Sequence, residues 1–236
     1  KPLAFVPVYF GYEKVIEGSS YMDELRGANK KAESVLDLIN GLKVIRQNFG
    51  ELQVNLGEPI KLDEWLEQNH SQPPKQDKQN TLANTPANAA GDQLIKALGA
   101  QIMGNINAQA TVNSVNLIAL ASLSIDQEVM EEKQITEQCD CYMQILHSLY
   151  GNQVFTNPDM TGQSSIEKVE ALGLITRTTE SFGAVFHHEP FTALLMTWYR
   201  NNVLHLMALP SLVASLLVHR QQAASVSELE KMVALI

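Results

Sequence analysis

The sequence predicts an α/β protein in which the edge of a layered sheet, with the order β-α-α-β, is followed by a mostly α-helical region with a small hairpin. Three observations support this fold class. Residues 3–10 form an apolar run, apolar side chains recur every three or four positions across residues 32–49, and residues 97–125 carry no charge. The hydrophobic fraction of 45% supplies enough apolar side chains for a buried core.

The first strand is predicted from the run LAFVPVYF at residues 3–10. Its nearly continuous apolar character is expected of a strand that is covered on both faces. Pro7 cannot donate a ladder hydrogen bond, so this position is expected to be an edge, a bulge or a strand end. Gly11 then closes the run.

Two helices and a second strand are expected next. A short helix should end near Leu25, and residues 32–48 have the spacing of an amphipathic helix. The alternation in LQVNL at residues 52–56 predicts a half-buried strand, and a further short helix is expected at 62–68.

We place a domain boundary at residues 71–92, where three prolines and many Asn and Gln residues accompany almost no large apolar side chains. This composition is typical of a linker or an exposed loop. Residues 1–70 are then the end of an α/β domain, and residues 93–236 form a helical C-terminal domain.

The helical domain is expected to begin with the uncharged stretch of 29 residues at 97–125, which six Asn and Gln side chains interrupt. Because amides are costly inside a bilayer, a buried helix pair with polar contacts is favoured over a membrane span. Further helices are expected at 136–150 and 164–172, followed by a β-hairpin within 174–187.

A last helical region is expected to begin at Pro190 and to kink or divide at Pro210. Residues 201–219 carry no charge and approach membrane-spanning length, but their asparagines, histidine and proline argue against a span. We expect the apolar surfaces near 106–125 and 203–218 to serve domain packing or peripheral attachment to a membrane.

The charge of the chain argues against nucleic acid as a partner. The formal net charge is −9, and no segment carries the concentrated basic surface that a polyanion binder needs. The helices and hairpin of residues 127–187 suggest a winged-helix shape, which often binds DNA. However, residues 126–189 contain three basic residues against at least ten acidic ones, so a packing module without nucleic acid is favoured.

Short catalytic and metal-binding motifs are weak in this sequence. Cys139 and Cys141 are separated by one residue, which suits neither a strain-free disulfide nor a CxxC metal site, so we expect two ordinary thiols with Cys141 in the core. His187 and His188 would point apart in a strand, so no metal site is expected there. The sequence contains no GxSxG, GxGxxG or Walker motif.

One cluster of cations follows the first strand. Arg26, Lys30 and Lys31 lie within six residues, beside Gly27. The cluster is either a solvated charge run or a small phosphate-contacting patch at the mouth of a cleft.

Several long blocks carry a family resemblance. They are FVPVYFGYEKVIEG, SYMDELRGANKKAES and NFGELQVNLGEPI near the start, and ANAAGDQL, NINAQATVNSVNLIAL and LLMTWYRNNVLHLMALPSLVASL farther along. Together they resemble the bacterial membrane-associated glycerol-3-phosphate acyltransferases over nearly the whole chain, as the C-terminal portion of such an enzyme.

The resemblance implies transfer of a fatty acyl group from acyl-CoA or acyl-carrier protein to the 1-hydroxyl of glycerol 3-phosphate. The product would be lysophosphatidate, the first intermediate of phospholipid synthesis, and no cofactor is implied beyond the acyl donor. The family's HxxxxD motif supplies the general base and the aspartate that orients it. None of the six histidines here has an aspartate five positions later, so we expect this motif to precede Lys1 and the segment alone to be inactive.

Five residues of this chain are expected to bind substrate, three of them from the resemblance and two from the cation cluster. Val6, Pro7 and Val8 correspond to the family's VPV strand, which shapes the acyl pocket. Arg26 and Lys30 are candidates for contact with a substrate or CoA phosphate. No catalytic or metal-binding residue is expected in the segment.

The expected location is peripheral, on the cytoplasmic face of the bacterial inner membrane. Two alternatives stay open: a non-catalytic interaction module of a degenerate homologue, and a winged-helix DNA-binding regulator. The upstream sequence separates the first from an enzyme, and a DNA-binding assay tests the second.

Overall fold

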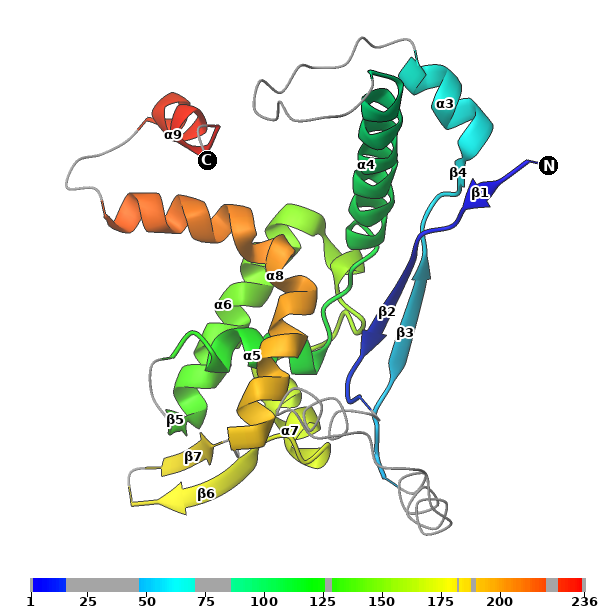
Figure 1. The fold of residues 1–236 in the computed structure, drawn as a ribbon. Coiled ribbons are helices and arrows are strands. Elements are labelled where there is room, and N and C mark those ends of the chain that lie inside the picture. Colours follow the sequence, from blue (N-terminus) through cyan, green and yellow to red (C-terminus); the bar gives the residue numbers. More distant parts are fainter. Residues whose placement is uncertain are drawn as a thin grey trace, which may run out of the picture. The chain divides into compact units, whose positions relative to one another are not determined.

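The computed structural model describes residues 2–15, 47–70, 86–125, 129–181, 183–187, 190–219 and 225–234 (Figure 1). The chain divides into two compact units. Unit 1 comprises Lys1–Phe10 and Gln53–Ala110, and unit 2 comprises Gly11–Leu52 and Thr111–Ile236. The predicted helices up to residue 46 and most of the predicted linker at 71–92 lie outside the described residues, and the predicted domain boundary stays a prediction.

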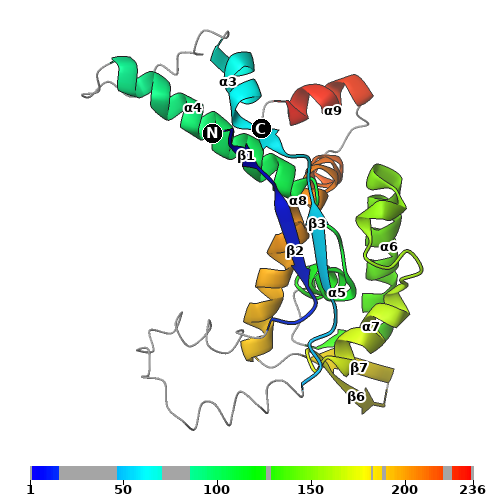
Figure 2. The same cartoon turned by 90° about the vertical axis from the view of Figure 1, so that its right-hand side faces the viewer.

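Short strands and two helices make up unit 1. In chain order the elements are β1 (Ala4–Phe5), β2 (Val8–Tyr12), β3 (Leu52–Leu56), β4 (Ile60–Lys61), α3 (Leu62–His70) and α4 (Pro86–Asn107). Of these, β2 and β3 each extend into unit 2 at one end. β1 pairs antiparallel with β4. β2 pairs with β3, and Figure 2 shows these two strands side by side. The described part of the chain therefore contains small two-stranded sheets here, and the layered sheet expected from the sequence is not seen in it.

The predicted first strand is divided in two. β1 ends at Phe5 and β2 begins at Val8, so the break falls at Pro7, as expected for a residue without a backbone N–H. The expectation that both faces are covered is wrong for the described residues, because burial alternates along β2. In β3 the alternation is confirmed, but the leucines and Val54 are exposed while Gln53 and Asn55 are half-buried.

Unit 2 is mainly helical. Its elements after β3 are α5 (Ser114–Ser122), β5 (Met130–Glu131), α6 (Glu132–Tyr150), η1 (Asn152–Val154), α7 (Gly162–Ala171), β6 (Thr176–Glu180), β7 (Gly183–His187), α8 (Pro190–Val218) and α9 (Val226–Val233). α5 packs against α6, α7 and α8, and eight of its nine residues are buried. It is the central helix of this core, which explains why its sequence carries no charge.

The starts of α5 and α7 are fixed by side-chain caps. Asn113 and Asn116 form a reciprocal capping box at the start of α5, and Thr161 and Ser164 form another at the start of α7. α7 therefore begins two residues before the predicted start at Ser164. At the other end of α6, Gly151 has a positive φ of 74° and stops the helix.

The predicted hairpin is confirmed as β6 and β7, and β5 adds a third strand to give the order β5-β7-β6. The chain order α5, β5, α6, α7, β6, β7 is that of a winged helix, with α7 immediately before the hairpin (Figure 1). In DNA-binding proteins of this kind, the equivalent helix enters the major groove.

The last long helix, α8, contains Pro210 and is not divided there, but Figure 1 shows that it bends along its length, so of the two expected outcomes the structure fits a kink. Within the described residues, the stretch Thr192–Val218 has the length and the mean hydropathy, 1.5, of a membrane-spanning helix, on length and composition alone. Of the most apolar 18-residue part of this stretch, only 17% is buried. Most of this helix surface is therefore not used in the core of the unit.

Three further predictions need correction. The uncharged stretch 97–125 does contain two helices, but only α5 is buried, whereas most of α4 is exposed. Residues 86–92, assigned to the linker, are the first turns of α4. The predicted core position of Cys141 is also wrong, because Cys139 is the buried thiol and Cys141 is exposed.

Candidate functional site

The bend between β1 and β2 is held by backbone hydrogen bonds. The N–H of Gly57 donates to the carbonyl oxygen of Pro7 across 2.9 Å, and the N–H of Leu62 donates to the carbonyl oxygen of Leu3 across 2.9 Å. A Cβ at Gly57 would lie 3.3 Å from the Cβ of Pro7. The two segments of the chain therefore approach closely at a point where a side chain would crowd them. Pro7 is therefore fixed in a buried position.

The residues predicted to line the acyl pocket lie on opposite faces of this segment. Val6 is 51% exposed and Val8 is half-buried, whereas Pro7 and Tyr9 are buried. Phe10 continues the open face. Other exposed apolar side chains of unit 1 on β3 are those of Val54 and Leu56. The structure thus gives unit 1 an uncovered apolar surface beside a buried proline.

The end of β2 and the residues after it belong to unit 2 and are bound by the helices of that unit. The Nδ2 amide of Asn113 donates to the carbonyl oxygen of Tyr12 across 3.2 Å. Three residues later, the N–H of Val15 donates to the phenol oxygen of Tyr199 across 2.9 Å. The Nδ2 amide of Asn116 donates to the carbonyl oxygen of Tyr199 across 2.9 Å, which joins the two contacts into one network.

The two residues between these contacts are bound as well. The Glu13 carboxylate lies 3.2 Å from the Nζ of Lys168, and the Nζ of Lys14 donates to the carbonyl oxygen of Leu172 across 2.7 Å. Residues 12–15 thus each contact a helix of unit 2 or its end. We call this set of partners, Asn113, Asn116, Lys168, Leu172 and Tyr199, the 12–15 clamp.

Glu13 is a buried carboxylate whose partners are in place. Only 7% of its side chain is exposed, and it accepts a hydrogen bond of 2.8 Å from the N–H of Glu51 in addition to the ion pair with Lys168. Gly50 has a positive φ of 69°, and a Cβ there would overlap the Glu13 carboxylate. A glycine is therefore required beside this carboxylate.

Two pKa values in the clamp are shifted. Desolvation lowers the pKa of Lys168, but the hydrogen bonds and charges of Glu13 and Glu51 outweigh this effect and raise the pKa above its ordinary value. Burial raises the pKa of the Tyr199 phenol, and the hydrogen bond from Val15 partly opposes the rise. Lys168 therefore stays charged and Tyr199 stays neutral near neutral pH.

The second predicted contact region, Arg26 and Lys30, lies outside the described residues. Arg200, on α8, is half-buried and donates to the side chain of its neighbour Asn201 across 3.1 Å.

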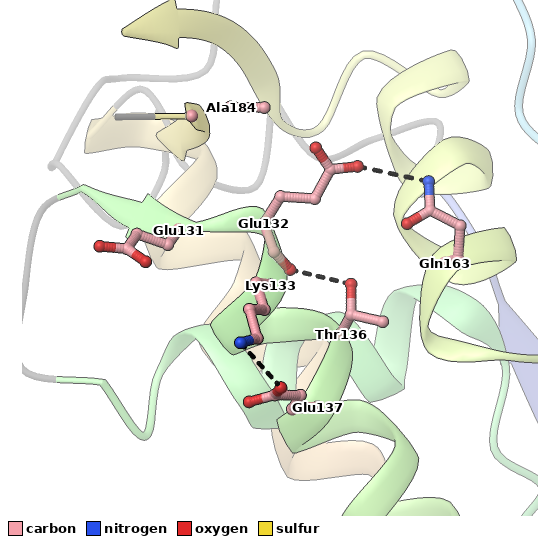
Figure 3. Close-up of a pocket in the computed structure, with 8 residues that line it drawn as sticks. Glu131, Glu132, Lys133, Thr136, Glu137, Gln163 and Ala184 are labelled. Carbon is pink, nitrogen blue, oxygen red and sulfur yellow. Dashed lines mark hydrogen bonds and ion pairs between the residues drawn. The ribbon is translucent and has the colours of Figure 1, made fainter. Parts of the chain in front are cut away.

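A cavity of about 560 Å³ opens between α6, α7 and β7 (Figure 3). Its lining consists of Glu131, Glu132, Lys133, Thr136, Glu137, Gln163, Gly183 and Ala184. Lys133, the one cation in this lining, pairs with Glu137 at 3.8 Å, and Glu132 pairs with Arg177 at 3.1 Å and accepts from Gln163. This cavity does not offer the cation cluster that a phosphate requires.

A second cavity of about 570 Å³ lies between α6 and α8 and is mostly apolar. It is lined by Cys141, Gln144, Ile145, Ser148, Leu149, Leu209, Pro210, Val213, Ala214 and Leu217. Cys139 is not part of this lining; burial and then the charge of Asp140 raise the pKa of its thiol to about 12, so it stays protonated near neutral pH. Among the described residues, no group of three or more His, Cys, Asp or Glu side chains is placed to hold a metal ion.

Sequence reasoning missed the clamp. Asn113 and Asn116 were noted only as amides that disfavour a bilayer, and neither Glu13 nor Tyr199 was singled out. The spacing of the two asparagines before an apolar run is a signal for a capping box, although it does not name the distant partner.

Comparisons with known proteins identify the family. A family model described as the glycerol-3-phosphate acyltransferase C-terminal region matches residues 21–236. The chain belongs to this family.

Curated relatives agree with the family match. The chain is 40% identical over 214 residues to the glycerol-3-phosphate acyltransferases of Ectopseudomonas mendocina (strain ymp) and Pseudomonas putida (strain GB-1). It is 39% identical over 215 residues to the protein of the same name from Pseudomonas aeruginosa (strain LESB58). Each match covers 91% of this chain and 25% of the relative. The chain therefore spans about a quarter of the length of these curated relatives.

Proposed function

We propose that this chain is the C-terminal portion of a bacterial glycerol-3-phosphate 1-O-acyltransferase. The enzyme transfers a fatty acyl group from acyl-CoA or acyl-carrier protein to sn-glycerol 3-phosphate and forms lysophosphatidate. The observation that carries the proposal is the identity of about 40% to proteins of that name across 91% of the chain. The small sheets and exposed apolar strands of unit 1 fit a domain completed by residues outside this chain.

The chemistry of the transfer is assigned to residues outside the chain. Deprotonation of the substrate hydroxyl by a positioned base contributes about 10²–10⁴-fold to such reactions. The HxxxxD spacing that would supply this base is absent from all six histidines here. The segment by itself should therefore position substrate and support the catalytic domain without catalysing transfer.

Five residues are proposed to contact substrate. Val6 and Val8 line the acyl-side wall, and Pro7 fixes the shape of that wall; the exposed apolar face beside a buried, hydrogen-bonded Pro7 supports these roles. Arg26 and Lys30 contact a phosphate of glycerol 3-phosphate or of CoA. The cations within six residues beside Gly27 are the support for this assignment.

We propose peripheral attachment to the cytoplasmic face of the inner membrane. The second half of α8 supports this location, since Leu209, Leu217 and Val218 are 53%, 48% and 80% exposed. Full-length protein should sediment with anionic vesicles, and replacement of Leu217 and Val218 by Gln should release it. Unchanged sedimentation of that variant would contradict attachment through α8.

A DNA-binding regulator is the second candidate, because the element order of unit 2 is that of a winged helix. The charge opposes it: α7 contains one basic residue, Lys168, and this residue is already paired with Glu13. A mobility-shift assay with mixed-sequence DNA at low salt should give no shift. A salt-dependent shift would favour the regulator.

Product analysis of the full-length protein tests the acyltransferase proposal. The purified protein is incubated with glycerol 3-phosphate and either palmitoyl-CoA or palmitoyl-acyl-carrier protein, and the lipid product is identified by mass spectrometry. We expect 1-acyl lysophosphatidate with at least one donor, and no product when the histidine of the HxxxxD motif is replaced by alanine. A full-length sequence without that motif, and without product, would instead favour a degenerate homologue.

A further inference from the structure

Four consecutive residues of this chain are bound by the helices of unit 2. Tyr12 and Val15 are held through their backbones by Asn113 and Tyr199, while the side chains of Glu13 and Lys14 are held at α7. The partners are 101 and 184 residues away along the chain for the two backbone contacts. These contacts fix a segment of the chain that directly continues β2.

The part of unit 2 that makes these contacts includes the helix with which a winged helix usually reads DNA. Lys168 lies on α7 and reaches Glu13 at 3.2 Å and Glu51 at 3.6 Å. The carbonyl oxygen of Leu172, at the end of the same helix, accepts from Lys14. The one basic residue of α7 is therefore paired with acidic groups of its own chain, and the end of the helix accepts from Lys14.

The remaining contacts are buried and leave little freedom. Asn113 and Asn116 are each 1% exposed, and Tyr199 is fully buried. Each asparagine uses its oxygen in the capping box of α5 and its Nδ2 amide for a longer-range bond. Each asparagine therefore links the start of α5 to a distant carbonyl oxygen. A shift of α5 would move Tyr12 through Asn113 and α8 through Asn116.

We propose that the helices of unit 2 hold residues 12–15, which belong to the same unit, and thereby fix the C-terminal end of β2, the strand that begins at Val8. Asn113, Asn116 and Tyr199 are the positioning residues. This inference rests on the proposed function, because the strand matters only if it shapes the acyl site. The clamp itself is a separate claim with its own test.

Hydrogen exchange in the full-length protein tests whether the clamp holds. Tyr199→Phe removes only the phenol oxygen that accepts the N–H of Val15. We expect amide exchange at Val15 to become at least tenfold faster, with exchange in the β6–β7 hairpin unchanged. The matched control is Tyr150→Phe, which removes a bond of 3.1 Å from the α6 phenol to the carbonyl oxygen of Leu206 and should leave Val15 protected. Unchanged exchange at Val15 in Tyr199→Phe would overturn the clamp.

Donor selectivity tests whether the clamp positions the strand. We expect Tyr199→Phe to change the ratio of kcat/KM for C16 and C10 acyl-CoA at least threefold, because the acyl wall is displaced. A substitution that only destabilises the fold, such as Tyr150→Phe, would lower the fraction of active protein and leave the ratio of kcat/KM for the two donors unchanged. If Tyr199→Phe speeds amide exchange at Val15 but leaves the ratio of kcat/KM for the two donors unchanged, the positioning role is overturned.

A second variant covers the case in which Tyr199→Phe does not fold. Asn113→Ser keeps a side-chain oxygen suited to capping α5 but cannot reach the carbonyl oxygen of Tyr12. We expect this variant to show faster amide exchange near Tyr12 and a changed ratio of kcat/KM for the two donors. The absence of both changes would overturn the inference. A wild-type protein without acyltransferase activity would refute the proposed function and the positioning role, whereas the exchange result would still decide whether the clamp exists.

Discussion

The Nδ2 amide of Asn116 donates to the backbone carbonyl oxygen of Tyr199 across 2.9 Å, although 83 positions separate the two residues. This bond joins α5 to α8 inside the core of unit 2, where both residues are almost inaccessible to water. The same asparagine accepts a hydrogen bond of 3.1 Å from the N–H of Asn113. One side chain therefore contributes to a helix cap and to helix packing.

Replacement of Asn116 by alanine should destabilise unit 2 by about 1–3 kcal/mol, because the N–H of Asn113 would be left buried without its partner. Urea unfolding followed by circular dichroism measures the change. Asn201→Ala is the matched control, since Asn201 is exposed on α8 and should change stability by less than about 0.5 kcal/mol. Equal effects of the two substitutions would contradict the structural role of Asn116.

The two acidic partners of Lys168 should differ in importance. Glu13 has 7% of its side chain exposed and Glu51 has 81%. Glu13→Gln is expected to cost about 1–3 kcal/mol, because a hydrogen-bonded charge pair is lost at a buried site. Glu51→Gln should cost less than about 0.5 kcal/mol, as for most surface pairs. Thermal unfolding of both variants measures the two losses of stability. A larger loss with Glu51→Gln than with Glu13→Gln would contradict this order.

Unit 2 should lose stability in alkaline solution. The pKa of Cys139 is raised from 9.0 to about 12, first by burial and then by the charge of Asp140. Above pH 9 the unfolded chain loses the thiol proton while the folded chain keeps it, so this contribution is complete below pH 9 and is lost as the pH approaches 12.

The expected decrease from this thiol is about 1.4 kcal/mol per pH unit in that window. The raised pKa values of Tyr199 and Lys168 act in the same direction at higher pH. Cys139→Ala should reduce the slope of unfolding free energy against pH, measured by urea titration between pH 8 and 10.5. An identical slope in the variant would show that Cys139 is not the group responsible.

The two thiols should react at very different rates. Cys141 is exposed, whereas Cys139 is fully buried and donates weakly towards the carbonyl oxygen of Leu117 at 3.9 Å. At pH 8 a disulfide reagent should modify one thiol per native chain and both in denaturant. Cys141→Ser should abolish the fast phase, and rapid loss of both thiols in the native protein would contradict the burial of Cys139.

The local elements could be predicted from the sequence because their signals are local. The hairpin of β6 and β7, the long helix α8 and the break at Pro7 follow from turn residues, apolar spacing and the missing N–H of proline. The start of α7 was predicted two residues late, because the capping box of Thr161 and Ser164 was not recognised.

The faces of the strands could not be predicted in the same way. Alternation in residues 52–56 shows that the two faces differ, but it does not say which one is covered. Here the polar side of β3 is the more buried, and Asn55 donates to the carbonyl oxygen of Gln109 across 2.8 Å. The clamp was missed for a related reason, since no sequence pattern connects Val15 with Tyr199.

The most direct test of the central claim compares this 236-residue chain with the full-length protein in one assay. Each is incubated with radiolabelled glycerol 3-phosphate and palmitoyl-CoA, and labelled lysophosphatidate is counted after extraction. We predict steady product formation by the full-length protein and none above background by the chain alone, because the base is proposed to lie outside the chain. Acylation of glycerol 3-phosphate by the isolated chain, or failure of a full-length protein with an intact HxxxxD motif, would contradict the account.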